Sequence, residues 1–148
     1  MDSLGKILIA SNDSNFRASM VNNLLDQFKA HSIEVLSTEA IFRKIEKEKI
    51  ILLLLDSSII SKEISNFFNK FSKIEKKCFV FLFYTSEEKE LIKENYPISQ
   101  KFLKPIKIEQ VFAFIRKYLI DEKKDEKKII LNNFHLLIHE RAILNSEN

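Results

Sequence analysis

Glycine and cysteine are scarce in this sequence, and the scarcity of each excludes certain classes of protein or site. The 148 residues include one glycine, one cysteine and no tryptophan. Gly5 alone cannot build a glycine-rich phosphate loop, which excludes P-loop NTPases and ordinary dinucleotide-binding domains. Cys78 alone excludes a disulfide within the chain and a cysteine-rich zinc site. We expect Cys78 to be a small buried hydrophobe at the start of a strand.

Long apolar runs and an excess of charge of one sign are also lacking. No run reaches the roughly 20 residues that span a membrane, and no signal-peptide segment follows the start. Lys and Arg number 24 and Asp and Glu 21, a net charge of +3. These charges are mixed and do not form the basic stripe of a nucleic-acid groove. We therefore expect a soluble cytoplasmic protein without a membrane partner.

Hydrophobic periodicity, in contrast, is strong and alternates between two types. Hydrophobic residues make up 45% of the chain, and short apolar runs typical of strands alternate with helical spacing. Strands are predicted at residues 6–10, 33–36, 50–55, 78–84 and 101–103, and helices at 16–28, 40–48, 61–74, 87–94 and 108–119. Strict alternation predicts an α/β fold, with a doubly wound five-stranded parallel sheet flanked by helices.

Polar side chains follow the predicted strands at their carboxyl ends, where such sheets place their functional sites. Asp56 follows the third strand, Thr85 the fourth and Lys104 the fifth. A carboxylate, a hydroxyl and an ammonium group are thus predicted to converge at one edge of the sheet. Each also has a plain structural interpretation. Asp56 could cap a helix, Thr85-Ser-Glu-Glu88 matches a capping box, and Lys104 could be a solvated loop lysine.

The ordered set resembles the receiver domain of two-component response regulators, the CheY-like family with a flavodoxin-like fold. The resemblance rests on Leu-Leu-Leu-Leu-Asp56, Thr85 and Lys104-Pro105, and covers residues 6–119. It implies that a histidine kinase or phosphotransfer protein donates a phosphoryl group to Asp56. Lys104 would pair with that carboxylate, Thr85 would contact the phosphoryl group, and magnesium would neutralise its charge. Such a module is no enzyme beyond its own phosphorylation.

Four departures from the family pattern fall mainly on its metal-binding half. Ser11 and Asn12 stand where the family has two adjacent acidic residues, and Asp13 comes one position too late. Ser58 lies in an altered loop after Asp56, which in the family supplies a backbone carbonyl to the metal. The switch position three residues before Lys104, commonly aromatic, is Lys101, and the fourth helix is expected to be short. Since magnesium prefers carboxylates, we expect weak magnesium binding or none.

Two functional hypotheses follow from a site that keeps the phosphoacceptor half of the family pattern and lacks its metal-binding half. In the first, a degenerate receiver acts through protein contacts, with phosphorylation slow, metal-independent or absent. In the second, Asn12 and Asp13 still recruit a cation, and Asp56 is a working phosphoacceptor. The loss of both acidic positions favours the first hypothesis.

Hypotheses from other classes stay open beside these two. A small α/β enzyme using Asp56 and Lys104 would require a pocket with convergent polar groups. A structural dimerisation module would use the last helix and the apolar tail. A receiver could also form a homodimer through the face formed by its fourth helix, fifth strand and fifth helix.

Beyond a receiver-like domain at residues 1–120, the sequence changes in character. Residues 121–128 are charge-dense and predict a linker or a helix extension. Residues 129–148 are apolar again and form a short tail, either a remnant or the start of a winged-helix effector domain. DNA binding is expected only if such a domain follows, because no recognition helix is present. His135 and His139 have zinc-ligand spacing on a helix but lack the rest of a zinc-protease motif.

Overall fold

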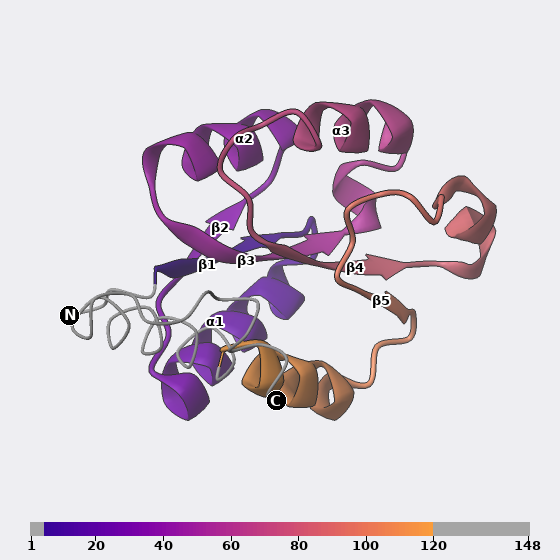
Figure 1. Cartoon of the computed structure of the whole chain (residues 1–148). Coiled ribbons are helices and arrows are strands. Elements are labelled where there is room, and N and C mark those ends of the chain that lie inside the picture. Colours follow the sequence, from indigo (N-terminus) through magenta and orange to yellow (C-terminus); the bar gives the residue numbers. More distant parts are fainter. Residues whose placement is uncertain (1–4, 120–148) are drawn as a thin grey trace, which may run out of the picture. The chain divides into compact units, whose positions relative to one another are not determined.

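The chain alternates strands and helices in the predicted order (Figure 1). The computed structural model describes residues 5–119. Its elements are β1 (Lys6–Ala10), α1 (Ser14–Phe28), β2 (Ser32–Val35), α2 (Thr38–Lys47), β3 (Ile50–Asp56), η1 (Ser57–Ile59), α3 (Ile64–Phe71), β4 (Phe79–Tyr84), η2 (Ser86–Leu91) and β5 (Gln100–Leu103). The two elements η1 and η2 are 3₁₀ helices. Residues 108–119 form a further helix, which belongs to a second compact unit.

The five strands form one parallel sheet in the order β2-β1-β3-β4-β5. This arrangement confirms the predicted doubly wound sheet. The strand order switches between β1 and β3, which are neighbours in the sheet. Ile7 pairs with Leu52 at one end of this contact, and Ala10 pairs with Leu55 at the other. The carboxyl ends of these two strands therefore lie side by side, at the place where open α/β sheets bind their ligands.

Helices cover both faces of the sheet, with α2 and α3 on one side and α1 on the other (Figure 1). On the α2–α3 side, Leu53, Leu55, Val80 and Leu82 belong to one buried cluster, which also contains Phe67, Phe68 and Phe71 of α3. On the α1 side, Phe16 meets Phe83 edge to face, with ring centroids 5.4 Å apart. All seven residues of β3 are buried, as expected of a central strand covered on both faces.

The predicted third and fourth helices are both shorter than the sequence indicated. The third was predicted at residues 61–74, but α3 spans only Ile64–Phe71, and the 3₁₀ helix η1 lies between it and β3. The fourth was predicted as a helix over 87–94, and the structure corrects this to the 3₁₀ helix η2. The chain turns back toward the sheet after η2. There Ile92 is buried and Tyr96 stacks on Phe68 with ring centroids 4.8 Å apart.

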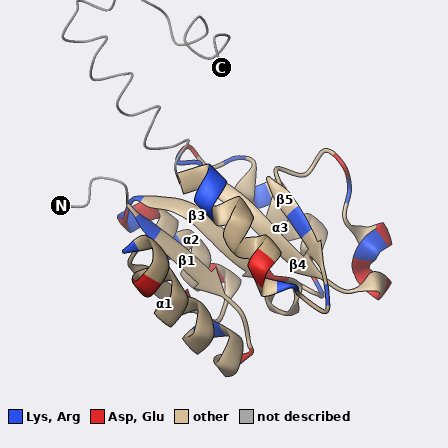
Figure 2. Ribbon diagram, turned by 90° about the horizontal axis from the view of Figure 1, so that it is seen from below, with Lys and Arg blue, Asp and Glu red and all other residues tan. Residues whose placement is uncertain are grey.

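The spacing of Ile108, Val111, Phe112, Ile115 and Leu119 predicts one apolar stripe on the helix at residues 108–119; the last four are buried, whereas Ile108 is half-buried. The predicted linker at 121–128, the tail at 129–148 and its two histidines lie outside the described residues. Within the described part of the chain, no helix is long and apolar enough to cross a membrane. Figure 2 shows the charged residues mixed over the ribbon, while β3 carries a single charge at its end, Asp56.

Candidate functional site

Asp56 is a buried carboxylate that accepts hydrogen bonds at both oxygens. It ends β3 and is 6% exposed. Its Oδ1 atom lies 2.6 Å from Nζ of Lys104 and 3.1 Å from the backbone nitrogen of Ser58. Its Oδ2 atom accepts from the hydroxyl of Ser11 at 3.0 Å. Three donors from three strand ends therefore hold the charge of Asp56, and charge-assisted bonds of this kind are the stronger class.

Lys104 directly follows β5, which lies next to β4 in the sheet. Its side chain extends from this strand end to Asp56. The backbone nitrogen of Lys104 donates to the carbonyl of Tyr84 at 2.8 Å, which extends the β4–β5 ladder by one bond. The peptide bond that follows, Lys104–Pro105, is cis. The Lys104 side chain is 29% exposed, whereas the Asp56 side chain is 9% exposed. The predicted contact between these two residues is therefore present. Lys101 lies on β5 itself and is exposed.

Ser11 occupies the first position of the missing acidic pair and is fully buried. Its hydroxyl donates to Asp56 and also accepts from the backbone nitrogen of Asp13 at 3.0 Å. Its carbonyl accepts from a guanidinium nitrogen of Arg17 at 2.8 Å, and Arg17 also pairs with Glu34 at 3.0 Å. Ser11 is thus held by hydrogen bonds at its side-chain hydroxyl and at its backbone carbonyl. A neutral donor stands where the family pattern has an anionic metal ligand.

Asn12 and Asp13 have local partners in the structure. The Asn12 side-chain amide donates to the carbonyl of Ser58 at 3.4 Å, a long bond at the surface. Asp13 is the N-cap of α1, and its Oδ1 atom accepts from the backbone nitrogens of Asn15 and Phe16 at 3.0 and 3.1 Å. This carboxylate therefore satisfies helix donors that would otherwise be unpaired.

Thr85 is tied to Glu88 and reaches Asp56 only through intermediate residues. It is the N-cap of η2 in the capping box that the sequence indicated, and its backbone nitrogen donates to Oε1 of Glu88 at 2.9 Å. The same oxygen accepts from the hydroxyl of Ser57 at 2.6 Å. The structure thus brings Asp56 and Lys104 together, whereas Thr85 is linked through Glu88 to Ser57, the residue that follows Asp56. Sequence reasoning assigned Glu88 to the cap but gave no sign of its bond to Ser57.

The pKa of the Glu88 carboxyl reflects its contacts with Ser57, Thr85 and Lys104. Partial burial alone raises the pKa of the Glu88 carboxyl, but hydrogen bonds from Ser57 and Thr85 and the charge of Lys104 outweigh it. The net result is a pKa below the ordinary value of 4.5. Glu88 is therefore an ionised carboxylate held by specific donors.

The side chains around Asp56 do not form a donor set suited to magnesium. Magnesium takes oxygen ligands in a near-octahedral arrangement and favours carboxylates. Here Asp56 is the one carboxylate that meets Ser11, Ser58 and Lys104, and Lys104 brings a positive charge against it. Within residues 5–119, no group of three or more His, Cys, Asp or Glu side chains is arranged to hold a metal ion.

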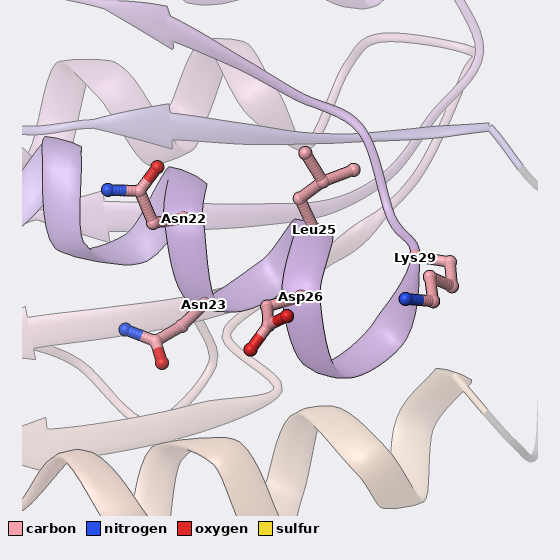
Figure 3. A pocket seen from close by; sticks show the side chains of 5 residues that line it. All are labelled: Asn22, Asn23, Leu25, Asp26 and Lys29. Carbon is pink, nitrogen blue, oxygen red and sulfur yellow. The ribbon is translucent and has the colours of Figure 1, made fainter.

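Two other features of the described chain offer little chemistry. Burial raises the pKa of the Cys78 thiol to about 12, so this half-buried cysteine has little thiolate character. An open hollow of about 510 Å³ runs along α1 and is lined by Asn22, Asn23, Leu25, Asp26 and Lys29 (Figure 3). None of the predicted site residues lines it. It is therefore not the pocket around Asp56 and Lys104 that a small α/β enzyme would need.

Comparison with known structures identifies the fold. A response regulator receiver domain protein (CheY-like) from Methanospirillum hungatei JF-1 superposes with a TM-score of 0.67 at 21% identity, covering 83% of this chain and 99% of that one. The signal receiver domain of a putative Luxo repressor protein from Vibrio parahaemolyticus has a TM-score of 0.65 at 13% identity, covering 82% and 95%.

An adenylate cyclase from Rhodopirellula baltica has a TM-score of 0.70 at 14% identity, covering 86% of this chain and 96% of that one. No protein-family model and no curated protein matches the sequence. The structural neighbours include response-regulator receiver (CheY-like) domains, and the chain has their fold.

Proposed function

We propose that this chain is an atypical receiver module of two-component signalling that acts through protein contacts. In this proposal, Asp56 does not serve as a magnesium-dependent phosphoacceptor. The module catalyses no reaction of its own, resides in the cytoplasm and has a histidine kinase or phosphotransfer protein among its candidate partners.

One observation carries the proposal. Asp56 and Lys104 meet at 2.6 Å at the carboxyl edge of a receiver fold, while Ser11 binds the second oxygen of Asp56. The first contact is the pairing that the receiver resemblance implies. The second gives the carboxylate a fixed neutral donor at the position where the family pattern has an acidic metal ligand. Without the acidic pair of the family pattern, the site has less negative charge to attract the cation that would neutralise an incoming phosphoryl group.

The alternative is a working phosphoacceptor that recruits a cation through Asn12 and Asp13. The two side chains have other partners in the structure, because Asn12 contacts the carbonyl of Ser58 and Asp13 caps α1. A cation bound by Asp13 would share this carboxylate with the two helix donors that its Oδ1 atom accepts. These contacts favour the first proposal. A homodimer through the face of the fourth helix, fifth strand and fifth helix, or through the C-terminal tail, stays a prediction.

Phosphorylation by a small donor tests the proposal directly. The full chain is incubated with acetyl phosphate, with and without magnesium, and the intact mass is recorded over time. We expect no stoichiometric, magnesium-dependent mass gain. The matched variants are Asp56→Asn and Asp26→Asn, the latter at an exposed aspartate on α1. A full mass gain that survives Asp26→Asn and disappears in Asp56→Asn would overturn the proposal in favour of the phosphoacceptor.

A further inference from the structure

A lysine-rich surface lies at the edge of the sheet where the strands begin, opposite the edge that carries Asp56. Helices α2 and α3 lie side by side on one face of the sheet (Figure 1) and meet through Phe42 and Phe67, whose ring centroids are 5.2 Å apart. Both helices end close to the start of the next strand, α2 before β3 and α3 before β4. We define the amino-edge surface as Lys6 together with residues 44–49 and 70–77.

The amino-edge surface gathers charge of one sign from segments that are separate in the sequence. It contains eight lysines and three glutamates, a charge of +5, whereas the whole chain carries +3. The rest of the chain is therefore net acidic. Charges of both signs are mixed along the sequence, so the excess becomes visible only once the fold joins the segments. One bond joins them directly, from Nζ of Lys76 to the carbonyl of Glu46 at 2.6 Å.

Helix capping accounts for only part of this charge. Lys76 donates to a carbonyl near the end of α2, and Nζ of Lys77 donates to the carbonyls of Phe71 and Ser72 at the end of α3, at 3.2 and 2.9 Å. A helix C-terminus carries about half a negative charge, so two such ends amount to about −1. The charge of +5 is several times what the helix ends require. Gathering it costs stability through mutual repulsion, which a structural role alone does not explain.

Contacts within the surface fix several ammonium groups and offset little of their charge. Nζ of Lys70 lies 4.5 Å from the centroid of the Phe42 ring. Glu48 pairs with two lysines, Lys6 at 2.8 Å and Lys44 at 3.6 Å. Hydrogen bonding from Lys6 and the charges of both lysines outweigh desolvation and hold the pKa of the Glu48 carboxyl below 4.5. A carboxylate inside the surface is thus more than balanced by its neighbours.

We propose that the amino-edge surface binds the phosphate backbone of duplex nucleic acid without reading its sequence. The duplex carries about one negative charge per 1.7 Å of its axis, and lysines that neutralise phosphates release condensed counterions. Phosphate contacts position a protein on the duplex and carry no sequence information. This inference goes beyond the proposed function, because it concerns the opposite edge of the sheet and does not depend on Asp56.

Other anionic partners fit the surface less well. Protein interfaces are depleted in lysine and rely on apolar or aromatic anchors, and in the described part of the chain the exposed large hydrophobic residues are Leu25, Leu36, Leu91 and Leu103, all outside this surface. Stable attachment to a lipid surface takes a second, apolar signal besides a basic patch. Single strands bind on exposed aromatic platforms, whereas Phe71 is buried here. A duplex backbone requires only the lysines.

Fluorescence anisotropy of a short labelled DNA duplex tests the proposal with the full chain. Binding is measured at a series of sodium chloride concentrations, with two duplexes of unrelated sequence. The test variant, Lys47→Gln with Lys73→Gln, removes one exposed lysine from each segment of the surface. The matched control, Lys62→Gln with Lys93→Gln, removes the same charge from exposed positions outside it.

We expect the two duplexes to bind equally well and the affinity to fall steeply with salt. Each phosphate contact contributes about −0.9 to the slope of log K against log salt concentration, so the test variant should have a slope shallower by about 1.8. Its affinity at about 0.1 M salt should be lower by about tenfold or more. The matched control should keep the native slope, because its lysines lie outside the surface.

A second readout needs no variant. Titration of the duplex into the isotope-labelled native chain should shift the backbone NMR signals of residues 44–49 and 70–77 more than those of η2. Shifts confined to other residues, absence of binding at low salt, or equal losses in the two double variants would overturn the proposal.

The partner class is decided by two further probes, vesicles that contain phosphatidylserine and an acidic polypeptide, polyglutamate. We expect both to bind more weakly than the duplex at equal salt. If either binds as tightly as the duplex, nucleic acid is not the preferred partner and the proposal fails. None of these measurements uses a phosphoryl donor or alters Asp56, so their outcome leaves the proposed function untouched.

Discussion

At the scale of single residues, Asp56 is a nucleophile candidate whose two carboxylate oxygens both accept hydrogen bonds. Its two oxygens accept from Lys104, Ser58 and Ser11, and the side chain is 9% exposed. A carboxylate held by fixed donors is stabilised in its ground state, which lowers its tendency to attack a phosphoryl donor. The same contacts contribute to the stability of the fold, because a buried charge without partners is costly.

Removing Lys104 should therefore destabilise the protein through Asp56. Lys104→Met leaves the carboxylate without its cation, and we expect the free energy of unfolding to fall by about 2 kcal/mol. This value is below the cost for fully buried pairs because Lys104 is 29% exposed. In Asp56→Asn the same substitution should cost much less. Urea denaturation of the two single variants and the double variant measures this coupling.

The control for this experiment is Lys101→Met on the same strand. Lys101 is exposed, so its replacement should change the free energy of unfolding by no more than about 0.5 kcal/mol. Strictly additive effects of Lys104→Met and Asp56→Asn would show that the 2.6 Å contact contributes nothing to stability.

Glu88 should make the stability of the protein depend on pH in the acid range. Its pKa in the folded protein lies below the ordinary value of 4.5, so the unfolded chain binds more protons as the pH falls. The contribution of Glu88 is present above about pH 5 and is lost as the pH drops through the folded pKa. The difference in unfolding free energy between the native protein and Glu88→Gln should therefore shrink on acidification.

Glu87→Gln is the matched variant for this titration, because it removes an exposed carboxylate from the same 3₁₀ helix. Denaturation curves of the three proteins at a series of pH values provide the comparison. If the two variants have the same pH dependence, the hydrogen bonds to Glu88 do not stabilise its charged form.

At the scale of elements, the strand ends explain which predictions were confirmed. Strands β1 and β3 are continuous apolar runs, and such runs specify buried strands directly. The sheet order then brings Ser11, Asp56 and Lys104 to one edge. This is why the meeting of Asp56 and Lys104 could be predicted from sequence. The cap at Thr85 was also predictable, because its signal is local.

The rest of the site depends on contacts that no local pattern encodes. The bond of Ser57 to Glu88 joins positions 31 residues apart, and it exists because the 3₁₀ helix η2 turns Glu88 toward the end of β3. Hydrophobic periodicity predicted a longer helix there, because it carries no information about the packing of Tyr96 on Phe68. The role of Ser11 as a donor was equally hidden, because a serine after a strand is usually a turn residue.

Asp13 offers a test of these element-level assignments. As the N-cap of α1, it should tolerate Asp13→Asn, because asparagine caps equally well, whereas Asp13→Ala should cost about 1 kcal/mol of stability. Thermal or urea unfolding of both variants measures this, with Asn15→Ala as a neighbouring control. Equal losses in Asp13→Asn and Asp13→Ala would point to a role for the negative charge, as the cation hypothesis requires.

At the scale of the whole molecule, the chain has the receiver fold, and our proposal is that its site binds magnesium weakly or not at all. A ligand that binds only the folded state raises its stability by an amount set by the ratio of ligand concentration to Kd. The stability of the native protein should therefore respond to magnesium no more than to an equal ionic strength of sodium. Thermal unfolding in the two salts measures this difference.

Restoring the acidic pair should reverse that behaviour. Ser11→Asp with Asn12→Asp places two carboxylates beside Asp56, and their mutual repulsion should lower the Tm in the absence of divalent ions. Magnesium should then raise the free energy of unfolding by about 2.7 kcal/mol at a hundred times its Kd, and the gain should keep growing with the logarithm of the magnesium concentration. Asn22→Asp with Gln27→Glu adds the same charge to exposed positions of α1 and should respond to magnesium no more than to an equal ionic strength of sodium. If the restored pair also responds no more than that, the altered loop after Asp56, and not the missing carboxylates, prevents metal binding.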